Sequence, residues 1–529
     1  MRAVKKVVTP IDIQVVNRLL SSVAEEMGIV LQRSAFSSNI KERRDFSCAI
    51  FDRDAKLLAQ AAHIPVHLGA MPDVVRMVRD EFRLDPGDIV ITNDPFRGGT
   101  HLPDITLISG VFDEDDKTLL FYLAARAHHA DVGAKIPGSM GLSTSLDEEG
   151  VLISPAYLAV KGKMQEEFFA KLIGAMRNPS ERSGDLRAQV ACLYRGQQRL
   201  KETLATFGKR RFFEVLPHLI DYGRRFMSAA ISQIPDGNYT FTDYMDDDGM
   251  GSQPVPITAT LTVRGDEAAV DFTGTAPQAP TCINATLSVT RSAVFYCFFC
   301  LVGEGYPVNA GSLEPVTVIA PEGCLLNPRP PAPVAAGNVE TSQRIVDTVL
   351  GALSKALPEK IPAAGCGTMN NIAIGSASTG QDQFTYYETI GGGMGASSRC
   401  DGMSGVQVHM TNTLNTPVEA LEQTYPMMIE RYGIRDGSGG KGRHRGGDGL
   451  IRRYRFLAPC TVSLLTERRV FAPYGLYGGE DGKRGANLLF RKGQGSPERL
   501  PGKCVISVEK GDCLEIRSPG GGGYGVIEP

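Results

Sequence analysis

The sequence predicts a mixed α/β protein of the α+β class with several domains, and three observations support this prediction. The chain has 529 residues, more than one ordinary hydrophobic core contains, so two to four domains are expected. Residues 164 to 234 are charged, poor in glycine and apolar at a helical period, which predicts a helical middle segment. The last third is dense in glycine and short apolar runs, which is typical of β-rich structure with long loops. We therefore expect four segments: an N-terminal region (1–160), a helical segment (161–236), a mixed α/β segment (237–360) and a glycine-rich, β-dominated region (361–529).

The N-terminal region is expected to begin with an amphipathic helix. Thr9 suits the N-cap, Pro10 suits the first helical position, and apolar residues recur at helical spacing as far as Met27. Apolar runs then predict strands at 46–51, 56–62, 89–92, 105–112 and 119–127, with an amphipathic helix at 71–82. The strand at 89–92 ends in an irregular loop rich in Asn, Pro and Gly.

The later segments carry helix and strand signals of their own. The helical segment is interrupted near Asn178 and Pro179. Alternating residues between 239 and 272 predict strands joined by an acidic turn at 246–249. A buried helix is expected at 286–302, and a capped helix from about Asn338 to Leu357.

Composition and charge argue against several classes of partner. The formal net charge is −3, so a basic surface for nucleic acid is not indicated. No apolar run approaches the roughly 20 residues that span a bilayer, and no signal-peptide core follows the N-terminus. Eleven cysteines without a repeating spacing fit free thiols. We therefore expect a cytoplasmic protein that binds neither nucleic acid nor membrane.

Histidine is scarce and unevenly placed. The chain has eight histidines, and the following five fall in one stretch of the N-terminal region: His63, His67, His101, His128 and His129. Asp94 and Asp104 flank His101 in the loop 93–104. Imidazole and carboxylate groups are the ligands that Zn²⁺ and Mn²⁺ favour. The alternative is that these histidines cap turns or donate to buried carbonyl groups. The concentration of five histidines favours a divalent-metal site.

The adjacent pair His128 and His129 ends a predicted strand. Neighbouring residues of a strand point to opposite faces, so only one of the two is expected to bind the metal. The other is expected to orient a substrate or to support a ligand from outside the coordination sphere.

The glycine runs do not predict a nucleotide site. The run at 436–442 contains Gly-Lys but lacks the Ser or Thr of a P-loop, and the run at 519–525 has no helix after it. Both are interpreted as loops whose glycines let backbone approach backbone. No Gly-x-Ser-x-Gly elbow is present to indicate a serine nucleophile. The polar run 409–422 fits two interpretations equally, a pocket lining or a set of self-satisfied turns.

Several segments, taken together, resemble the hydantoinase B-type subunit. They include Lys-Glu-Arg-Arg-Asp-Phe-Ser-Cys, the His101 loop, Arg-Ala-His-His-Ala-Asp-Val-Gly, Gly-Asn-Val-Glu-Thr-Ser-Gln-Arg and the terminal glycine run. The matching segments are 41–48, 93–104, 126–133, 337–344, 411–422, 445–449 and 519–525. This family includes subunits of N-methylhydantoinase, 5-oxoprolinase and caprolactamase, and it is related to the large subunits of acetone carboxylases.

The resemblance implies a metal-containing subunit that acts with an A-type ATPase partner, which binds ATP and Mg²⁺. It implies that Asp45, His101, Asp104 and one of the histidine pair, preferably His128, bind Zn²⁺ or Mn²⁺. Asp94 then becomes an organiser of its loop, and His129 a general base or proton relay. A hetero-oligomer with a homodimeric core is expected.

The activity that the resemblance implies is ATP-dependent hydrolysis of a cyclic amide. The partner would phosphorylate the ring oxygen, and a metal that lowers the pKa of bound water would supply the hydroxide that opens the ring. Two alternatives remain open: the metal subunit of an ATP-dependent ketone carboxylase, and a non-catalytic scaffold for the ATPase subunit.

Overall fold

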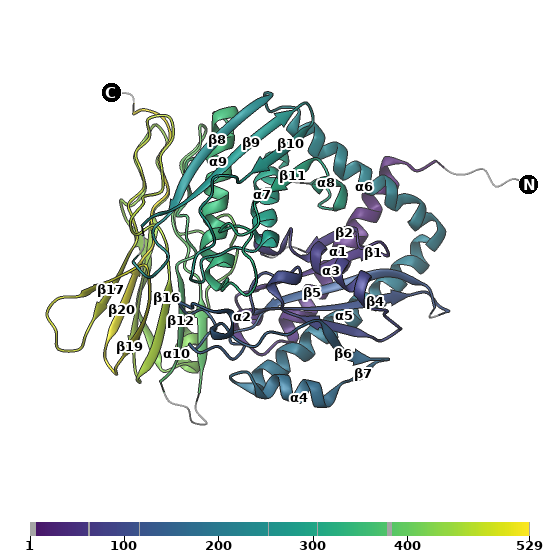
Figure 1. The fold of residues 1–529 in the computed structure, drawn as a ribbon, viewed down its shortest axis with the longest axis horizontal. Helices are drawn as coiled ribbons and strands as arrows, with labels where there is room; N and C mark the ends of the chain where they lie inside the picture. Colours follow the sequence, from purple (N-terminus) through teal and green to yellow (C-terminus); the bar gives the residue numbers. More distant parts are fainter. Residues whose placement is uncertain are drawn as a thin grey trace, which may run out of the picture.

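A computed structural model of the chain confirms the mixed α/β, multi-domain fold class. It describes residues 7–61, 64–115, 117–251, 253–303, 305–377 and 383–527, so His63 lies outside the described residues. Figure 1 shows the N-terminal sheet (purple to blue) at the lower right, the middle part (teal to green) at the top and the C-terminal sheets (yellow) at the left. None of the described helices is long and apolar enough to cross a membrane. All eleven cysteines lie in the described part and are free thiols.

The N-terminal part is built on a seven-stranded antiparallel sheet. Its strands are β1 (Phe46–Asp52), β2 (Leu57–Ala61), β3 (Ile89–Thr92), β4 (Asp104–Phe112), β5 (Leu119–His128), β6 (Ala156–Val160) and β7 (Lys163–Met164). Their order is β2-β1-β5-β4-β3-β6-β7, which puts β4 and β5 at the centre. The central strands are buried on both faces because helices cover the sheet on either side.

Helices on the two faces of this sheet form separate hydrophobic cores. The helices are α1 (Pro10–Ser34), α2 (Ser38–Lys41), α3 (Met71–Glu81), α4 (Glu166–Gly174), α5 (Pro179–Phe207) and α6 (Lys209–Ile231), with short 3-10 turns η1 (Pro65–His67), η2 (Pro95–Arg97) and η3 (Leu146–Glu148). Thr9 caps α1, as predicted. One core lies between the sheet and α1, α5 and α6, so the helical segment packs on the N-terminal region. The second core lies between the sheet and α3.

The middle part combines a four-stranded sheet with two buried helices. Its elements are β8 (Gly237–Met245), β9 (Val255–Arg264), β10 (Glu267–Asp271), α7 (Leu287–Val302), α8 (Ala310–Leu313), β11 (Val316–Ile319), the π-helical turn η4 (Gly337–Thr341) and α9 (Ser342–Ala356). The strand order is β11-β10-β9-β8, and α7 and α9 share one core with this sheet. The buried helix predicted at 286–302 is confirmed by α7.

One helix start differs from the prediction. The helix expected from about Asn338 opens with the π-helical turn η4, and no side chain caps either η4 or α9. The prediction of a capped helix was therefore wrong in its first turn. The Asn338 side chain is directed to His101 instead of to the helix backbone.

The C-terminal part is a sandwich of two antiparallel sheets around one core. Its elements are β12 (Asn371–Ser376), β13 (Thr385–Glu388), α10 (Val418–Thr424), β14 (Met427–Arg435), β15 (Gly449–Phe456), β16 (Cys460–Leu465), β17 (Ala486–Phe490), β18 (Glu498–Leu500), β19 (Lys503–Val508) and β20 (Cys513–Arg517). One sheet has the order β13-β12-β16-β19 and the other β14-β15-β20-β17-β18.

A glycine-rich bundle of extended segments adjoins the sandwich. The last glycine run lies at its centre, and its backbone bonds to several other segments. Gly521 donates to Gly447, Gly522 to Ala364 and Gly523 to Glu480, each at 2.8–2.9 Å. A Cβ added to Gly522 would lie 2.0 Å from the carbonyl oxygen of Tyr474. The predicted use of these glycines, close approach of backbone to backbone, is confirmed.

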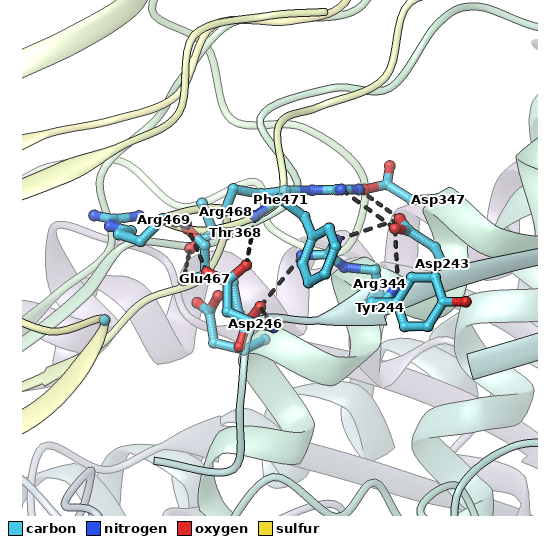
Figure 2. A network of polar contacts seen from close by, with 12 residues as sticks. Asp243, Tyr244, Asp246, Arg344, Asp347, Thr368, Glu467, Arg468, Arg469 and Phe471 are labelled. Carbon is cyan, nitrogen blue, oxygen red and sulfur yellow. Dashed lines mark hydrogen bonds and ion pairs between the residues drawn. The ribbon is translucent and has the colours of Figure 1, made fainter. Parts of the chain in front are cut away.

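Buried ion pairs join the middle and C-terminal parts. Arg344 from α9 and Arg468 from the loop after β16 both reach Asp243 of β8. Arg468 also pairs with Asp347, and Lys503 of β19 pairs with Glu467. Figure 2 shows the arginines lying between the carboxylates that they contact. These contacts fix β8 and α9 against the loop after β16.

Candidate metal centre

The centre of the first sheet carries two of the predicted ligands. Asp104 begins β4, His128 ends β5, and the two residues are direct partners in the antiparallel register. Side chains of paired residues lie on the same face of a sheet, here the face that α3 covers. The strand pairing therefore brings the carboxylate of Asp104 and the imidazole of His128 together.

The loop before β4 supplies the third group, His101. Asn93 holds this loop, since its side-chain amide donates to the carbonyl groups of Leu102 and Val151 at 2.8 and 2.9 Å. Asp94 accepts a hydrogen bond from the backbone N–H of Phe96 at 3.0 Å. Asp94 thus organises the loop and is not one of the converging groups.

Three potential ligand atoms converge within this cluster. His101 Nε2 lies 3.1 Å from both His128 Nδ1 and Asp104 Oδ1, and His128 Nδ1 lies 3.2 Å from Asp104 Oδ1. Atoms bound tetrahedrally at about 2.1 Å from a Zn²⁺ ion would lie about 3.4 Å apart. The three side chains are buried, with exposed fractions of 0–3%. Their spacing and chemistry fit a divalent cation.

Burial and mutual contact shape the ionisation of these groups. Burial would raise the pKa of the Asp104 carboxyl, but the neighbouring His101 and His67 and the hydrogen bonds from His101 and His128 hold that pKa well below its usual value. Burial also lowers the pKa of His128, against the opposing effect of its bond to Asp104. An ionised Asp104 and a neutral His128 are the protonation states in which these two groups bind a metal.

Two further predicted or neighbouring residues lie beside the cluster. The backbone carbonyl of Asp45 accepts a hydrogen bond from the His128 N–H at 3.0 Å, and its carboxylate is 3.7 Å from Arg43. Asp45 is adjacent to His128 but is not among the three residues whose ligand atoms converge. His67 was not predicted as a site residue, yet its Nε2 lies 3.4 Å from Asp104 Oδ2 and its Nδ1 lies 3.0 Å from Ser47 Oγ.

His129 lies on the opposite side of β5 from this cluster. Its Nε2 is 2.9 Å from the side-chain oxygen of Gln189, a residue of α5. Burial and the nearby Arg182 lower the pKa of His129 to about 4, so its imidazole is neutral near pH 7. The structure therefore separates the histidine pair as predicted. It does not bring His129 together with the other site residues, and a catalytic role for His129 stays a prediction.

Two side chains from distant segments complete the walls of the site. Asn338 of η4 places its Nδ2 3.0 Å from His101 Nε2 and 3.5 Å from Asp104 Oδ2. The ring of Tyr387, in β13, stacks on His128 with centroids 4.9 Å apart and an interplanar angle of 19°. Groups from the N-terminal, middle and C-terminal parts thus meet at one buried point.

Comparison with known proteins places this architecture in a family. The family model described as hydantoinase B/oxoprolinase matches residues 9–527. The chain belongs to the hydantoinase B/oxoprolinase family. It is 41% identical over 554 residues to 5-oxoprolinase 1 of Arabidopsis thaliana, covering 99% of this chain and 42% of that protein. It is 32% identical over 544 residues to the B-type subunit of a putative D-/L-hydantoinase from a Pseudomonas species, covering 98% and 90% respectively.

Solved structures share the fold of this hydantoinase B/oxoprolinase chain. The ATP-dependent caprolactamase from Pseudomonas jessenii superposes with a TM-score of 0.92 and 28% identity over 98% of this chain and 92% of that chain. A nucleotide-free acetone carboxylase superposes with a TM-score of 0.87, but at 17% identity this likeness shows the fold alone. The chain spans less than half the length of the plant 5-oxoprolinase but nearly all of the Pseudomonas hydantoinase chain.

Sequence reasoning on this family member missed His67, Asn338 and Tyr387 as parts of the site. His67 carried a signal, because it belongs to the cluster of five histidines. Asn338 lies in one of the segments that resemble the family, although nothing in its spacing relates it to His101. Tyr387 carried no signal, because only the packing of the sandwich on the first sheet brings its ring to His128.

Proposed function

We propose that this chain is the metal-containing subunit of an ATP-dependent cyclic amide hydrolase of the hydantoinase or 5-oxoprolinase type. The observation that carries the proposal is the convergence of His101, Asp104 and His128 on one buried point. Relatives named as 5-oxoprolinase and as a putative hydantoinase, and a structural neighbour named ATP-dependent caprolactamase, support the reaction class.

His101, Asp104 and His128 would hold a divalent cation, and Asp45 beside His128 would contribute the further carboxylate. A bound Zn²⁺ or Mn²⁺ would polarise the amide carbonyl and lower the pKa of a coordinated water. The chain's own groups prepare this site by burial: Tyr387 covers one face of His128, and the β4–β5 pairing fixes Asp104 opposite it. A buried site excludes bulk water, which strengthens electrostatic interactions inside it.

We propose that ATP with Mg²⁺ is bound by an A-type ATPase subunit. Neither glycine run of this chain has the form of a phosphate loop. Backbone atoms of neighbouring segments occupy the space beside the terminal run. The plant 5-oxoprolinase is more than twice as long as the matched region, which leaves room for a further functional part in such enzymes. The complete enzyme would be a hetero-oligomer, which we propose has a homodimeric core.

The two alternatives make different predictions for the purified complex. A ketone carboxylase would consume ATP only when bicarbonate and a ketone are present, whereas a cyclic amide hydrolase would consume it with a lactam or hydantoin alone. A scaffold would contain no stoichiometric metal. The converging ligand atoms argue against the scaffold, because a structural role does not require them.

The test combines metal analysis with an assay of ring opening. The complex of this chain and its A-type partner is purified with His101→Ala, and its metal content and ATP-coupled hydrolysis of a panel of cyclic amides are measured. Loss of both is expected, because the variant removes the imidazole that bridges Asp104 and His128. His218→Ala, which removes an exposed histidine of α6, is the matched control and should retain both. Full metal content in His101→Ala would contradict the assignment.

A further inference from the structure

We propose that Asn338 is an additional ligand of the metal centre, binding the cation through its side-chain oxygen. This inference rests on the proposed function, since it assumes that His101, Asp104 and His128 hold a divalent cation. It adds an amide oxygen from the middle part of the chain to a site whose other groups come from the first sheet and its loops.

The first observation is the backbone that carries Asn338. Residues Gly337–Thr341 form a π-helical turn, a rare conformation that occurs frequently at functional sites. Gly337 is required there, because an added Cβ would lie 1.7 Å from the carbonyl oxygen of Asn284. The wider π turn directs the Asn338 side chain to His101 instead of letting it cap the helix.

The second observation is that His101 Nε2 has too many polar neighbours for one nitrogen. His128 Nδ1, Asp104 Oδ1 and Asn338 Nδ2 all lie within 3.0–3.1 Å of it. A protonated Nε2 would donate to Asp104 but would face the hydrogens of the Asn338 amide. An unprotonated Nε2 would accept from Asn338 but would turn its lone pair to the carboxylate oxygen. With the Asn338 nitrogen facing His101, neither tautomer of His101 satisfies all these contacts.

A cation at the centre of the cluster removes this conflict. The lone pairs of His101, His128 and Asp104 would then point at the ion, and none would remain on His101 to accept from an amide. The oxygen and nitrogen of a carboxamide exchange places by rotation of its terminal group. With the oxygen turned inward, Asn338 offers the ion a further lone pair.

In the present orientation of its amide, the Asn338 side-chain oxygen accepts no hydrogen bond from the described residues. Asn338 is only 4% exposed, and its Oδ1 is a buried atom without a hydrogen-bond partner among the described residues. A buried amide oxygen without a hydrogen-bond partner destabilises the folded state. Rotation of the amide towards a cation would satisfy that oxygen.

The turn is held in place from its other side. Glu340 accepts hydrogen bonds from the Met369 N–H at 3.0 Å and from the Asn371 side chain at 2.6 Å. Asn371 in turn accepts from the Tyr387 hydroxyl at 2.6 Å. Since Tyr387 stacks on His128, the turn bearing Asn338 is tied to the opposite wall of the same site.

An additional oxygen ligand has a consequence for the choice of metal. Structural and catalytic Zn²⁺ sites are mostly four-coordinate and rich in nitrogen or sulfur, whereas Mn²⁺ favours more oxygen ligands and six-coordinate geometry. Two imidazoles, Asp104, Asp45 and the Asn338 oxygen would exceed four ligands. The inference therefore favours Mn²⁺ over Zn²⁺.

The test measures binding of Mn²⁺, Zn²⁺ and Co²⁺ alone to the full chain in complex with its partner. Asn338→Leu removes the amide while keeping the number and branching of the side-chain heavy atoms, and it should weaken Mn²⁺ binding by about tenfold or more. It should weaken Zn²⁺ binding less, and it should change the visible absorption of the Co²⁺ form, which reports coordination number. Asn338→Asp keeps an inward oxygen and should retain Mn²⁺ binding.

Ser342→Ala is the matched control, because Ser342 donates to the Asn338 backbone carbonyl at 2.8 Å and belongs to the same helical start. It should leave Mn²⁺ affinity and the Co²⁺ spectrum unchanged. Unchanged Mn²⁺ affinity and Co²⁺ absorption in Asn338→Leu would overturn the inference. Equal weakening in Asn338→Asp and Asn338→Leu would also overturn it, since the amide would then act as a donor. If the unmodified complex bound none of these ions, the proposed metal centre itself would fail.

Discussion

Three imidazoles surround the buried carboxylate of Asp104. His101 and His128 contact its Oδ1 at 3.1 and 3.2 Å, and His67 approaches its Oδ2 at 3.4 Å. An ionised carboxylate in a buried position is costly unless it is paired or coordinates a metal. The nearby His101 and His67 and the hydrogen bonds from His101 and His128 account for the low pKa of Asp104. Charge compensation and the proposed metal binding would thus use the same residues.

Glu149 is a second buried carboxyl whose ionisation affects stability at the residue scale. Burial raises the pKa of Glu149 from 4.5 to about 7, even though its Oε1 accepts from Ser143 and from the backbone N–H groups of Val334 and Ala335. The folded state therefore holds this proton more tightly than the unfolded state. The contribution to stability is full below pH 4.5 and is lost as the pH rises towards 7.

Glu149→Gln should remove this pH dependence in metal-free protein. We expect the variant to match the parent at about pH 4.5 and to exceed its free energy of unfolding at about pH 8 by up to about 3 kcal/mol. Denaturant titrations at the two pH values measure the difference. The control is Glu148→Gln at the adjacent residue, whose pKa is lowered by bonds to Thr144 and Lys135 and which should show no gain at the higher pH. An equal effect of Glu149→Gln at both pH values would contradict the prediction.

Residue types and spacing could identify part of the site but not all of it. His101, Asp104 and the histidine pair lie within one stretch of sequence, and strand alternation predicted that the pair would be split between two faces. Asp45 was named only through the family resemblance. Asn338 lies 237 residues along the chain from His101, which it contacts. Tyr387 lies 259 residues along the chain from His128, on which it stacks. Contacts of that separation depend on tertiary packing, which local patterns do not encode.

At the scale of the elements, helices and strands with clear periodicity were predictable. Thr9 and Pro10 mark the start of α1, and apolar runs mark β1, β3 and β5 close to their observed bounds. The start of the helix near Asn338 was not predictable in detail. Local propensity favours a capped start, but contacts of Asn338 with His101 and of Glu340 with Asn371 favour the π turn.

The glycine-rich bundle is an element whose integrity depends on the absence of side chains. Gly522→Ala would place a Cβ 2.0 Å from the Tyr474 carbonyl oxygen, so two backbone segments would have to separate. We expect the free energy of unfolding to fall by about 2–4 kcal/mol. Gly495→Ala is the matched control, because nothing lies within 4 Å of its added Cβ, and it should change stability by less than about 1 kcal/mol. Thermal and denaturant unfolding compare the two, and equal stabilities would disprove the packing role.

At the scale of the whole molecule, the candidate metal centre depends on how the three parts are held together. The first sheet supplies His101, Asp104 and His128, the middle part supplies Asn338, and the sandwich supplies Tyr387. The last two groups are positioned by the contact between the middle part and the sandwich. The ion pairs in Figure 2 lie in that contact, so they stabilise the arrangement that forms the site.

Arg468 is one of the buried cations in this contact, and it pairs with two carboxylates. Its guanidinium bonds to Asp243 at 2.7 Å and pairs with Asp347, and all three side chains are buried. Arg468→Met keeps the apolar volume but leaves two buried carboxylates with less compensation. We expect it to lower the free energy of unfolding by about 3–5 kcal/mol. Arg329→Met breaks an exposed pair with Glu322 and should cost less than about 1 kcal/mol.

The same variant should weaken the metal centre from a distance. Loss of Arg468 weakens the contact between α9 and the sandwich, which positions Asn338 and Tyr387. His101, Asp104 and His128 keep their sheet and loop contacts. Metal affinity of the Arg468→Met complex should therefore fall although no ligand is altered, whereas Arg329→Met should bind metal as the parent does. Titration with Mn²⁺ under conditions where both variants remain folded measures the effect. An unchanged affinity in Arg468→Met would show that the first sheet alone determines metal binding.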